Sequence, residues 1–454
     1  MSQKPRISKG TRDFSPSEVG KREYIFSIMK KVFGKYGFQP IETPSFELSE
    51  TLLGKYGEEG DRLIFRILNS GDKMLKADID AVKNRNLNKF SNSLSEKALR
   101  YDLTVPFARY VVQHQNDITF PFKRYQIQPV WRADRPQHGR YKEFYQCDID
   151  VVGSDSLLYE VECIQIFDEV LSKLGLPGFT IKINNRKLLN GIAEVSGESD
   201  RLVDIVTAID KLDKIGVEGV EEELAKREIS QSCIDMITPL FELKGTNKER
   251  LAQMSDFLAE SEIGMKGLQE LSFLFDMMKR TSLQKGKLEF DVCLARGLNY
   301  YTGAIFEVLA DDVKMGSICG GGRYDDLTSL FGLKGVSGVG ISFGADRIYD
   351  VLNELELFPD TVENNLSYLF LNFGAEEFVK CFELSNKLRE KGFSCEIYPV
   401  STKIQKQMKY ANERNAQNVL MIGSTELKNE QITIKSMESG EQKTMAIDEF
   451  LSQL

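Results

Sequence analysis

The segment VWRADRPQHGRYKEFYQCDIDVVG, residues 130–153, predicts a β-hairpin whose second strand carries polar side chains on one face. Residues two apart on a strand share a face, so one row of this strand consists of Phe144, Gln146, Asp148 and Asp150. An aromatic ring, an amide and two carboxylates are a poor lining for an apolar core. They suit the floor of a site for a polar ligand with a flat ring.

The loop of this hairpin carries three cations, Arg132, Arg135 and Arg140. A guanidinium group presents a rigid fork of donors that matches phosphate oxygens, so the loop favours an anionic ligand. The alternative is a solvent-exposed hairpin with ordinary surface charges, because the outer faces of antiparallel strands are often charged.

A second segment, LARGLNYYTG (residues 294–303), places Arg296 in an apolar context beside Tyr300 and Tyr301. Arginine is seldom buried without an anion, so this segment also favours a binding site. The alternative is a tyrosine-rich core strand with a surface arginine.

A third segment, GVGISFGADRI (residues 338–348), predicts a strand that runs into a helix. Its glycines permit close approach of a ligand or another backbone, and Arg347 lies in the first helical turn, where the helix dipole also favours an anion. The alternative is a glycine-rich strand packed beneath a helix. The nearby CGGGRY lacks the lysine and hydroxyl of a P-loop.

The composition is that of a globular protein, with 454 residues of which 41% are hydrophobic and 28% charged. The net charge of −9 argues against a broadly basic surface, although a local basic face for nucleic acid is compatible with it. Since His114 and His138 are the sole histidines, the sequence argues against a multi-histidine metal site, and we expect no structural metal.

Neither a membrane span nor a secretory signal is expected. The sequence contains no run of 18 or more apolar residues, and the N-terminal MSQKPRISKGTRDF lacks an apolar core. The seven cysteines occur without a CxxC pair, which favours buried, reduced thiols over a disulfide framework. These features predict a cytoplasmic protein.

The pattern of strands and helices predicts an α/β chain of two domains. The first spans residues 1–360, with a polar surface insertion at 76–97 and an insertion of helical periodicity at 190–284. Residues 366–454 alternate strands and helices with short connections, which predicts a compact α/β domain. A capping box at Ser15–Glu18 is expected to begin the first helix.

The order of these segments resembles motifs 1, 2 and 3 of the class II aminoacyl-tRNA synthetases. Within that class, RYDLT (100–104), GRYKEFYQCDID (139–150) and ARGLNYYTG (295–303) are similar to the histidyl-tRNA synthetase family. The resemblance covers nearly the whole chain. It implies an α+β catalytic domain on an antiparallel sheet, followed by a mixed-sheet anticodon-binding domain.

That family activates L-histidine with ATP to give histidyl-adenylate and pyrophosphate, and then transfers histidine to the 3′ end of tRNA(His). The resemblance therefore implies L-histidine, ATP and tRNA(His) as partners, with Mg²⁺ bound alongside the nucleotide. It also implies a homodimer whose interface includes the motif 1 helix and strand. No membrane partner is expected.

The resemblance assigns a histidine site to particular residues. The matching positions are Asp102, Thr104, Arg132, Gln146, Asp150, Arg296, Tyr300 and Tyr301. Asp102 and Thr104, with Gln146 beside them, match the residues that bind the α-ammonium group, whereas Asp150 and Tyr301 match those that read the imidazole. A site built to pair with both ring nitrogens rejects analogues lacking them by factors on the order of 10⁴–10⁵.

The resemblance also assigns a nucleotide site. The matching positions are Arg132, Asp134, Arg140, Tyr141, Phe144 and Arg347. Phe144 matches the ring on which adenine stacks. Arg132, Arg296 and Arg347 match the catalytic arginines that hold the phosphates, so the substrate carboxylate attacks and the chain needs no nucleophile of its own.

In the C-terminal domain, the predicted helix TKIQKQMKYANERNA places basic and aromatic side chains on adjoining turns. The residues that suit tRNA phosphates and a stacked base are Lys403, Lys406, Lys409, Tyr410 and Arg414. The alternative is an ordinary solvated helix face.

Some positions depart from the family pattern. Asn299 replaces an expected aspartate, and Asp102 and Asp134 are aspartates where one branch of the family carries glutamate. The insertion at 76–97 receives no role. Two further hypotheses are a catalytically silent regulatory or tRNA-sensing paralogue and a synthetase for threonine or proline. The presence of both the RGLNYYTG segment and the tail domain argues against a silent regulatory paralogue, and Arg132, Gln146 and Arg296 together argue against a tRNA-sensing module that has lost the pocket. The tyrosine pair beside Arg296 argues against a threonine or proline enzyme.

Overall fold

The computed structural model describes residues 4–135, 139–295, 301–359, 362 and 366–454. The chain divides into two compact units, Met1–Phe14 with Lys21–Phe358, and Ser15–Gly20 with Pro359–Leu454. None of the described helices combines the length and apolar character needed to cross a membrane.

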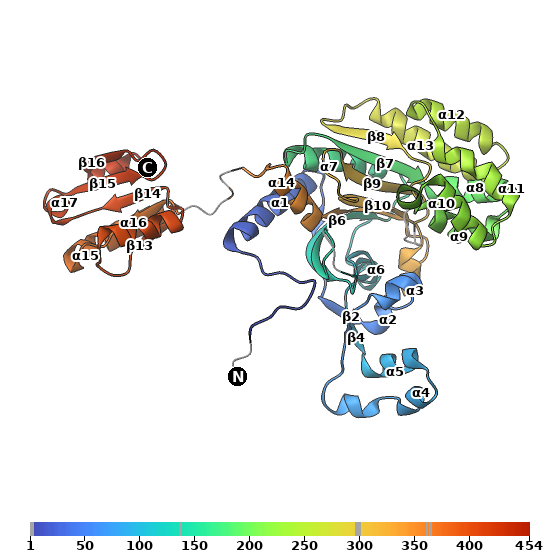
Figure 1. Ribbon diagram of the computed structural model, residues 1–454, viewed down its shortest axis with the longest axis horizontal. Coiled ribbons are helices and arrows are strands. Elements are labelled where there is room, and N and C mark those ends of the chain that lie inside the picture. Colours follow the sequence, from blue (N-terminus) through green and yellow to red (C-terminus); the bar gives the residue numbers. More distant parts are fainter. Residues whose placement is uncertain (1–3, 136–138, 296–300, 360–361, 363–365) are drawn as a thin grey trace. The chain divides into compact units, whose positions relative to one another are not determined.

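The larger unit is built on one large sheet, to which eight strands of the described residues belong (Figure 1). In spatial order the strands are β1 (Gln39–Pro40), β5 (Phe122–Trp131), β6 (Glu143–Val152), β11 (Gly338–Gly344), β10 (Cys319–Tyr324), β9 (Ala304–Ala310), β7 (Phe179–Asn185) and β8 (Gly286–Phe290). The two outer pairs, β1–β5 and β7–β8, run parallel, and the inner pairs run antiparallel. The expected antiparallel core is therefore confirmed.

Strand β6 separates an apolar face from a polar one. Cys147, Ile149 and Val151 belong to the main hydrophobic core, which also receives side chains from α1 (Pro16–Lys35) and α7 (Leu158–Lys173). The alternate residues of the strand face the other way. This period of two is what the hairpin sequence predicted.

Helix α1 begins as its sequence indicates. The Ser15 N–H donates to Glu18 Oε2 (2.6 Å) and the Glu18 N–H to Ser15 Oγ (3.4 Å), so the expected capping box is present. The chain then turns at Gly37, with φ of 80°, and enters β1 at the sheet edge. An edge position suits Pro40, which has no N–H to donate.

The region expected to be a helical insertion contains α8 (Arg186–Val195), α9 (Leu202–Ile209), α10 (Leu212–Lys226), α11 (Gln231–Ile237), α12 (Asn247–Phe257) and α13 (Glu262–Met278). The 3₁₀ segments η2 (Ser199–Arg201) and η3 (Thr238–Glu242) lie between them. Leu188, Leu271 and Leu274 join this group of helices to the main core. Figure 1 shows the helices gathered beside β7 and β8.

The remaining elements of the larger unit surround the sheet. They are β2 (Phe46–Leu48), α2 (Ser49–Leu52), α3 (Gly57–Arg62), β3 (Arg66–Ile67), η1 (Gly71–Lys76), α4 (Ile79–Lys83), α5 (Leu87–Leu94), β4 (Lys97–Leu99), α6 (Thr104–Gln113), η4 (Leu327–Phe331) and α14 (Ala345–Glu354). Strands β2, β4 and β3 form a separate small sheet.

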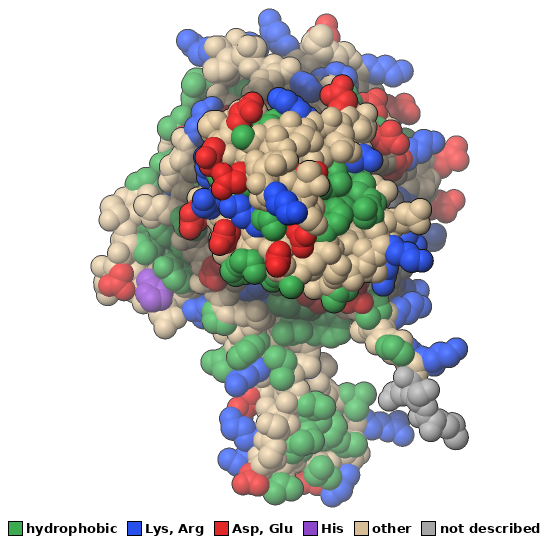
Figure 2. Space-filling view, turned by 90° about the vertical axis from the view of Figure 1, so that its left-hand side faces the viewer, with side chains coloured by type: hydrophobic (Ala, Val, Ile, Leu, Met, Phe, Trp, Pro, Cys, Tyr) green, Lys and Arg blue, Asp and Glu red, His purple; other side chains and the backbone are tan. Residues whose placement is uncertain are grey.

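The segment 76–97 folds into two short helices, α4 and α5. Their first turns are capped by side chains, since Asp78 accepts from the Ala81 N–H and Asn86 from the Lys89 N–H. Leu75 and Leu87 are largely exposed, and Figure 2 shows hydrophobic side chains among lysines and arginines on the lobe at the bottom of the view.

The smaller unit contains a mixed five-stranded sheet in the order β13 (Cys395–Ile397), β12 (Tyr368–Phe370), β14 (Asn418–Met421), β15 (Gln431–Ser436) and β16 (Gln442–Ala446). The first three strands run parallel and the last two antiparallel. Its helices are α15 (Ala375–Glu390), α16 (Ile404–Glu413), α17 (Ser424–Lys428) and α18 (Ile447–Ser452). The predicted mixed-sheet α/β tail is confirmed.

A buried ion pair joins α7 to β10 beneath the sheet. The guanidinium of Arg323 donates from Nη2 to Glu160 Oε2 (2.7 Å) and also contacts Oε1, and both side chains are almost fully buried. Arg323 donates further to Ser337 Oγ and to the carbonyl oxygens of Ser154 and Ser156. Removing one partner of such a pair leaves the other buried and uncompensated.

We expect Glu160→Gln to lower the free energy of unfolding by about 3 kcal/mol, because the charge of Arg323 would lose its counter-ion inside the protein. Urea denaturation followed by circular dichroism measures the change. Glu162→Gln is the matched control on the same helix: its pair with Lys123 is partly exposed at 22% and 20%, so the loss should stay below about 1 kcal/mol. Equal losses in the two variants would contradict the assignment.

Candidate active site

A cavity of about 820 Å³ lies over the open face of the large sheet in the larger unit. The predicted site residues that line it are Asp102, Thr104, Arg132, Asp134, Arg140, Tyr141, Phe144, Gln146, Asp150, Tyr301 and Arg347. They come from separate parts of the chain: the start of α6, the β5–β6 hairpin, the approach to β9 and the start of α14. Arg296 and Tyr300 lie outside the described residues.

The row predicted for β6 faces this cavity in full, since Phe144, Gln146, Asp148 and Asp150 all line it. Strand β11 lies alongside, with Gly340 directly opposite Asp150. A Cβ atom at Gly340 would lie 2.0 Å from Asp150 Oδ1, so the close approach of this carboxylate requires glycine there. The glycines of the third segment thus make room for a side chain of the site.

Asp150 is held by two residues that the sequence analysis missed. Arg124 Nη2 lies 2.6 Å from Asp150 Oδ2, with both side chains buried, and the Tyr324 hydroxyl donates to Asp150 Oδ1. Arg124 stands opposite Asp150 in the β5–β6 register. The sequence signal for Tyr324 was the CGGGRY segment, which is strand β10 and lines the same cavity.

Asp148 is a further carboxylate of the row and was not assigned a role. Its side chain is buried, and its Oδ1 has no hydrogen-bond partner among the described residues. Burial raises the pKa of Asp148 to about 7, and the nearby Asp150 and Asp102 add to this rise, whereas Arg124 opposes it. The group therefore titrates near neutral pH.

Asp102 lies just before α6 and lines the same cavity as the β6 row. Its Oδ1 accepts from the Tyr56 hydroxyl (2.8 Å) and from the Val105 N–H (3.1 Å), which fixes the carboxylate at the helix start. Burial raises its pKa. The helix itself begins at Thr104 and includes Pro106 in its first turn, where the missing N–H has no intrahelical partner to lose.

Arg132 follows β5 and lies between two aromatic rings. Its Nε donates to the Tyr101 carbonyl oxygen (3.0 Å), and its guanidinium carbon lies 4.3 Å from the Tyr101 ring centroid and 5.2 Å from that of Phe144. The contacts hold the cation beside the ring expected to take a flat base.

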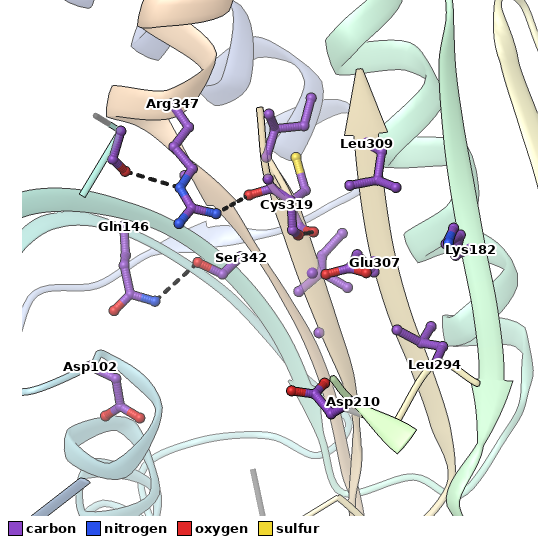
Figure 3. A pocket seen from close by; sticks show the side chains of 18 of the residues that line it. Asp102, Gln146, Lys182, Asp210, Leu294, Glu307, Leu309, Cys319, Ser342 and Arg347 are labelled. Atoms are coloured by element: carbon purple, nitrogen blue, oxygen red, sulfur yellow. Dashed lines mark hydrogen bonds between the residues drawn. The ribbon is translucent and has the colours of Figure 1, made fainter. Parts of the chain in front are cut away.

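Arg347 and Tyr141 form the opposite wall of the cavity. Arg347 donates from Nε to the Gly139 carbonyl oxygen (3.0 Å) and from Nη1 to that of Ser317 (2.5 Å), and Figure 3 marks hydrogen bonds of Arg347 with dashed lines. The Tyr141 hydroxyl donates to Asp350 (3.3 Å). Burial raises the pKa of Tyr141.

A network around Asp346 supports this wall and was also missed. Its Oδ1 accepts from Arg12 (2.5 Å) and Arg22 (2.6 Å), and its Oδ2 from the Tyr145 N–H (3.0 Å). Arg12 also lies over the Tyr141 ring, 3.5 Å from its centroid. The N-terminal segment is thereby bound to the first turn of α14.

In the smaller unit, the five residues proposed for RNA lie on or beside α16. Tyr410 donates to Glu396 Oε2 (2.9 Å), Arg414 also pairs with Glu396, and Lys409 lies 3.6 Å from Glu413. Arg414 lowers the pKa of Glu396. Lys403 and Lys406 are exposed. Three of the five therefore contact carboxylates of their own unit.

Comparisons with known proteins identify relatives over the whole length. A family model described as Histidyl-tRNA synthetase matches residues 10–348, and one described as Anticodon binding domain matches 369–454. The chain is 59% identical over 446 residues, 98% of each chain, to the histidine–tRNA ligase of Christiangramia forsetii, and 56% identical over 454 residues, all of each chain, to that of Bacteroides fragilis. The crystal structure of histidyl-tRNA synthetase from Nostoc sp. PCC 7120 is similar, with a TM-score of 0.83, 29% identity and full coverage of both chains.

The raised pKa of Asp148 predicts that the free energy of unfolding falls as the pH rises. In the unfolded chain this group ionises near 3.8, whereas in the folded protein it ionises at about 7, so folding retains a proton between these values. The protonated Asp148 therefore contributes to the free energy of unfolding at low pH, and this contribution is lost as the pH rises to about 7. Between pH 5 and pH 8, wild type should lose about 2 kcal/mol of unfolding free energy relative to Asp148→Asn.

Urea denaturation of both proteins at pH 5 and pH 8 measures this difference. Glu143→Gln removes an exposed carboxylate from the same strand and should follow the wild-type pH dependence. Parallel pH profiles for wild type and Asp148→Asn would show that Asp148 is ionised throughout.

Proposed function

The chain belongs to the histidyl-tRNA synthetase family and is a histidine–tRNA ligase, and from this premise we propose how its described residues perform the reaction. L-histidine reacts with ATP to give histidyl-adenylate and pyrophosphate, and histidine then passes to the 3′ end of tRNA(His). The observation that carries the proposal is one cavity with a row of buried carboxylates on its floor and Arg132 and Arg347 on its walls.

We assign the histidine side of the cavity to the β6 row and the start of α6. Asp102, Thr104 and Gln146 bind the α-ammonium group, because carboxylate, hydroxyl and amide oxygens are acceptors for its N–H donors. Asp150 and Tyr301 bind the imidazole nitrogens. Arg296 and Tyr300 belong to the same proposed site through the family resemblance.

The contacts of Asp150 support its role. Burial raises the pKa of Asp150, whereas Arg124 and Tyr324 favour the ionised carboxylate and fix its rotamer, so that Asp150 presents an acceptor to an imidazole N–H. An analogue without that N–H would leave a desolvated oxygen unpaired, which is the physical basis of strong discrimination.

We assign the nucleotide side to the hairpin loop and α14. Adenine stacks on Phe144, with Asp134, Arg140 and Tyr141 around the nucleotide. Arg132 and Arg347 hold phosphate oxygens, exchanging their present backbone carbonyl acceptors for charged ones. A histidine carboxylate oxygen attacks the α-phosphorus, pyrophosphate leaves in line, and the fixed cations stabilise the charge on the equatorial oxygens.

Mg²⁺ fits this site as an ion that arrives with the nucleotide. No group of three or more His, Cys, Asp or Glu side chains among the described residues could hold a metal ion alone. Mg²⁺ commonly takes one or two carboxylates together with substrate phosphates and water, and Glu307, which lines the cavity, offers such a carboxylate. When bound, Mg²⁺ neutralises phosphate charge.

We further propose that the smaller unit reads tRNA(His), with Lys403, Lys406, Lys409, Tyr410 and Arg414 on its RNA-binding face. The exposed Lys403 and Lys406 are the strongest candidates for phosphate contacts. Tyr410 and Arg414 would have to leave Glu396 to reach RNA, which supports a positioning role for that carboxylate.

Dimerisation and compartment follow from the same premise. We propose a homodimer through α1, β1 and the adjoining β2, whose Phe46 and Leu48 remain about half exposed.

We propose the cytoplasm as the compartment, because all seven cysteines are free thiols, as expected where disulfides do not persist. The silent regulatory hypothesis lacks support, since the site residues that the structure describes line one cavity and an anticodon-binding domain model also matches the chain.

Isotope exchange between pyrophosphate and ATP tests the function directly. The purified protein should catalyse exchange with L-histidine and not with the other amino acids, because the proposed pocket pairs with both imidazole nitrogens. Each amino acid is supplied alone at equal concentration. Exchange with a different amino acid, or with none, would overturn the proposal.

Removal of residues 366–454 should spare this exchange and reduce histidylation of tRNA by at least an order of magnitude, because the cavity is formed by the larger unit and tRNA contacts would be lost. Charging is measured with labelled histidine and tRNA(His). The full-length double variant Lys403→Ala, Lys406→Ala tests the proposed face without truncation. Unchanged charging in the truncated protein would exclude the tail as an RNA reader.

A further inference from the structure

The histidine side of the cavity contains more buried acceptors than the assigned roles use. Asp148 lies between Gln146 and Asp150 on the same face of β6. Its side chain is 2% exposed, and its Oδ1 has no hydrogen-bond partner among the described residues. A buried polar atom without a partner is uncommon in a native fold, and where it faces a binding cavity a ligand is one group that can pair with it.

Gln146, the next residue of the β6 row, also has a buried acceptor atom without a partner. Its amide nitrogen donates to Ser342 Oγ (3.1 Å), which turns the amide so that Oε1 is buried and also without a partner among the described residues. Figure 3 shows this oxygen directed away from Ser342, toward the side of the cavity where Asp102 lies. The contacts of Asp102 use its Oδ1 and do not involve Oδ2.

The carboxylates near these acceptors favour a positively charged ligand. Asp102 and Asp150 line the same cavity as Asp148 and lie near enough to raise its pKa, whereas Arg124 forms its ion pair with Asp150 and Arg132 lies near Asp102. Among the described residues, no salt bridge involves Asp102 or Asp148. Two desolvated carboxylates and an amide oxygen are thus available to a positively charged group with several N–H donors.

We propose that Asp148 is a further substrate-binding residue, which accepts a hydrogen bond from the α-ammonium group of histidine together with Gln146 and Asp102. The inference rests on the proposed function of the cavity. An ammonium group has three N–H donors, and the unpaired Asp148 Oδ1 and Gln146 Oε1 accept two of them, while Asp102 and Thr104 share the third. Asp150 remains free for the imidazole.

Binding then couples to protonation. The groups that face Asp148 are Arg124 from β5, Asp150 from its own strand, Asp102 from the start of α6 and the neutral Ser342 from β11. In the free protein its pKa is raised to about 7. An ammonium group beside it favours the ionised form, so histidine binding releases a proton and weakens as the pH falls below 7.

The test is the KM for histidine in pyrophosphate exchange, measured for wild type and Asp148→Asn from pH 6 to pH 8.5. At pH 8, the variant should show a KM for histidine about 10- to 100-fold higher, with kcat and the KM for ATP within about threefold of wild type. From pH 8 to pH 6, the wild-type KM should rise about tenfold more than that of the variant. Protonation of the substrate imidazole affects both proteins equally.

A substrate analogue decides which group Asp148 contacts. Imidazolepropionate lacks the α-ammonium group, so its inhibition constant should be equal for wild type and Asp148→Asn. A large change with this inhibitor would assign Asp148 to the imidazole and overturn the proposal. Glu143→Gln, which removes an exposed carboxylate from the same strand outside the cavity lining, should leave the KM for histidine unchanged.

The outcomes separate this inference from the function on which it rests. Wild type without histidine-dependent exchange would refute the proposed function. Active wild type combined with an unchanged KM and an unchanged pH profile in Asp148→Asn would refute the role of Asp148 alone. A fall in kcat without a change in KM would also refute it, because a binding residue acts on substrate affinity.

Discussion

The buried pair of Arg124 and Asp150 is the interaction on which the arrangement of the site depends. The two side chains stand directly opposite in the β5–β6 register and meet at 2.6 Å in an almost fully buried position. A slip of one residue would turn Arg124 toward the apolar core that contains Cys147 and Ile149. The cost of burying an unpaired guanidinium there excludes this alternative, so the ion pair specifies the register of the hairpin.

Register in turn decides where the cavity lies. Once Asp150 faces outward from the core, Gln146, Asp148 and Phe144 must share its face because the side chains of a strand alternate. The same carboxylate requires Gly340 on β11, since any Cβ atom there would overlap Asp150 Oδ1. One ionic contact thus fixes the register of the hairpin, the glycine on the neighbouring strand and the row of acceptor side chains on the cavity floor.

The sequence predicts much of this site because the relevant information is local. Alternation in residues 143–152 indicated the β6 row, the capping box indicated the start of α1, and the glycine strand with Arg347 indicated the β11–α14 unit. Arg124 could not be found in this way because its role depends on the register of the β5–β6 hairpin, and Tyr324 because it lies 174 residues from Asp150 along the chain. The same holds for Asp346, whose partner Arg12 is 334 residues away. The helices in 76–97 were missed because their polar composition, typical of a loop, conceals the caps at Asp78 and Asn86.

The position of Arg132 beside the acidic row gives the proposed amino-acid substrate a defined orientation. Asp102, Asp148 and Asp150 lie near one another, and Arg132 lies beside Asp102, where it contacts the Tyr101 carbonyl oxygen and two rings. An amino acid with its ammonium group among the carboxylates directs its own carboxylate toward the arginine. In the proposed reaction that carboxylate attacks the α-phosphate, so the acidic row and the adjoining arginine place the attacking oxygen beside the phosphate-binding cation before the reaction begins. The proposed activation therefore depends on position and charge and uses no nucleophilic side chain.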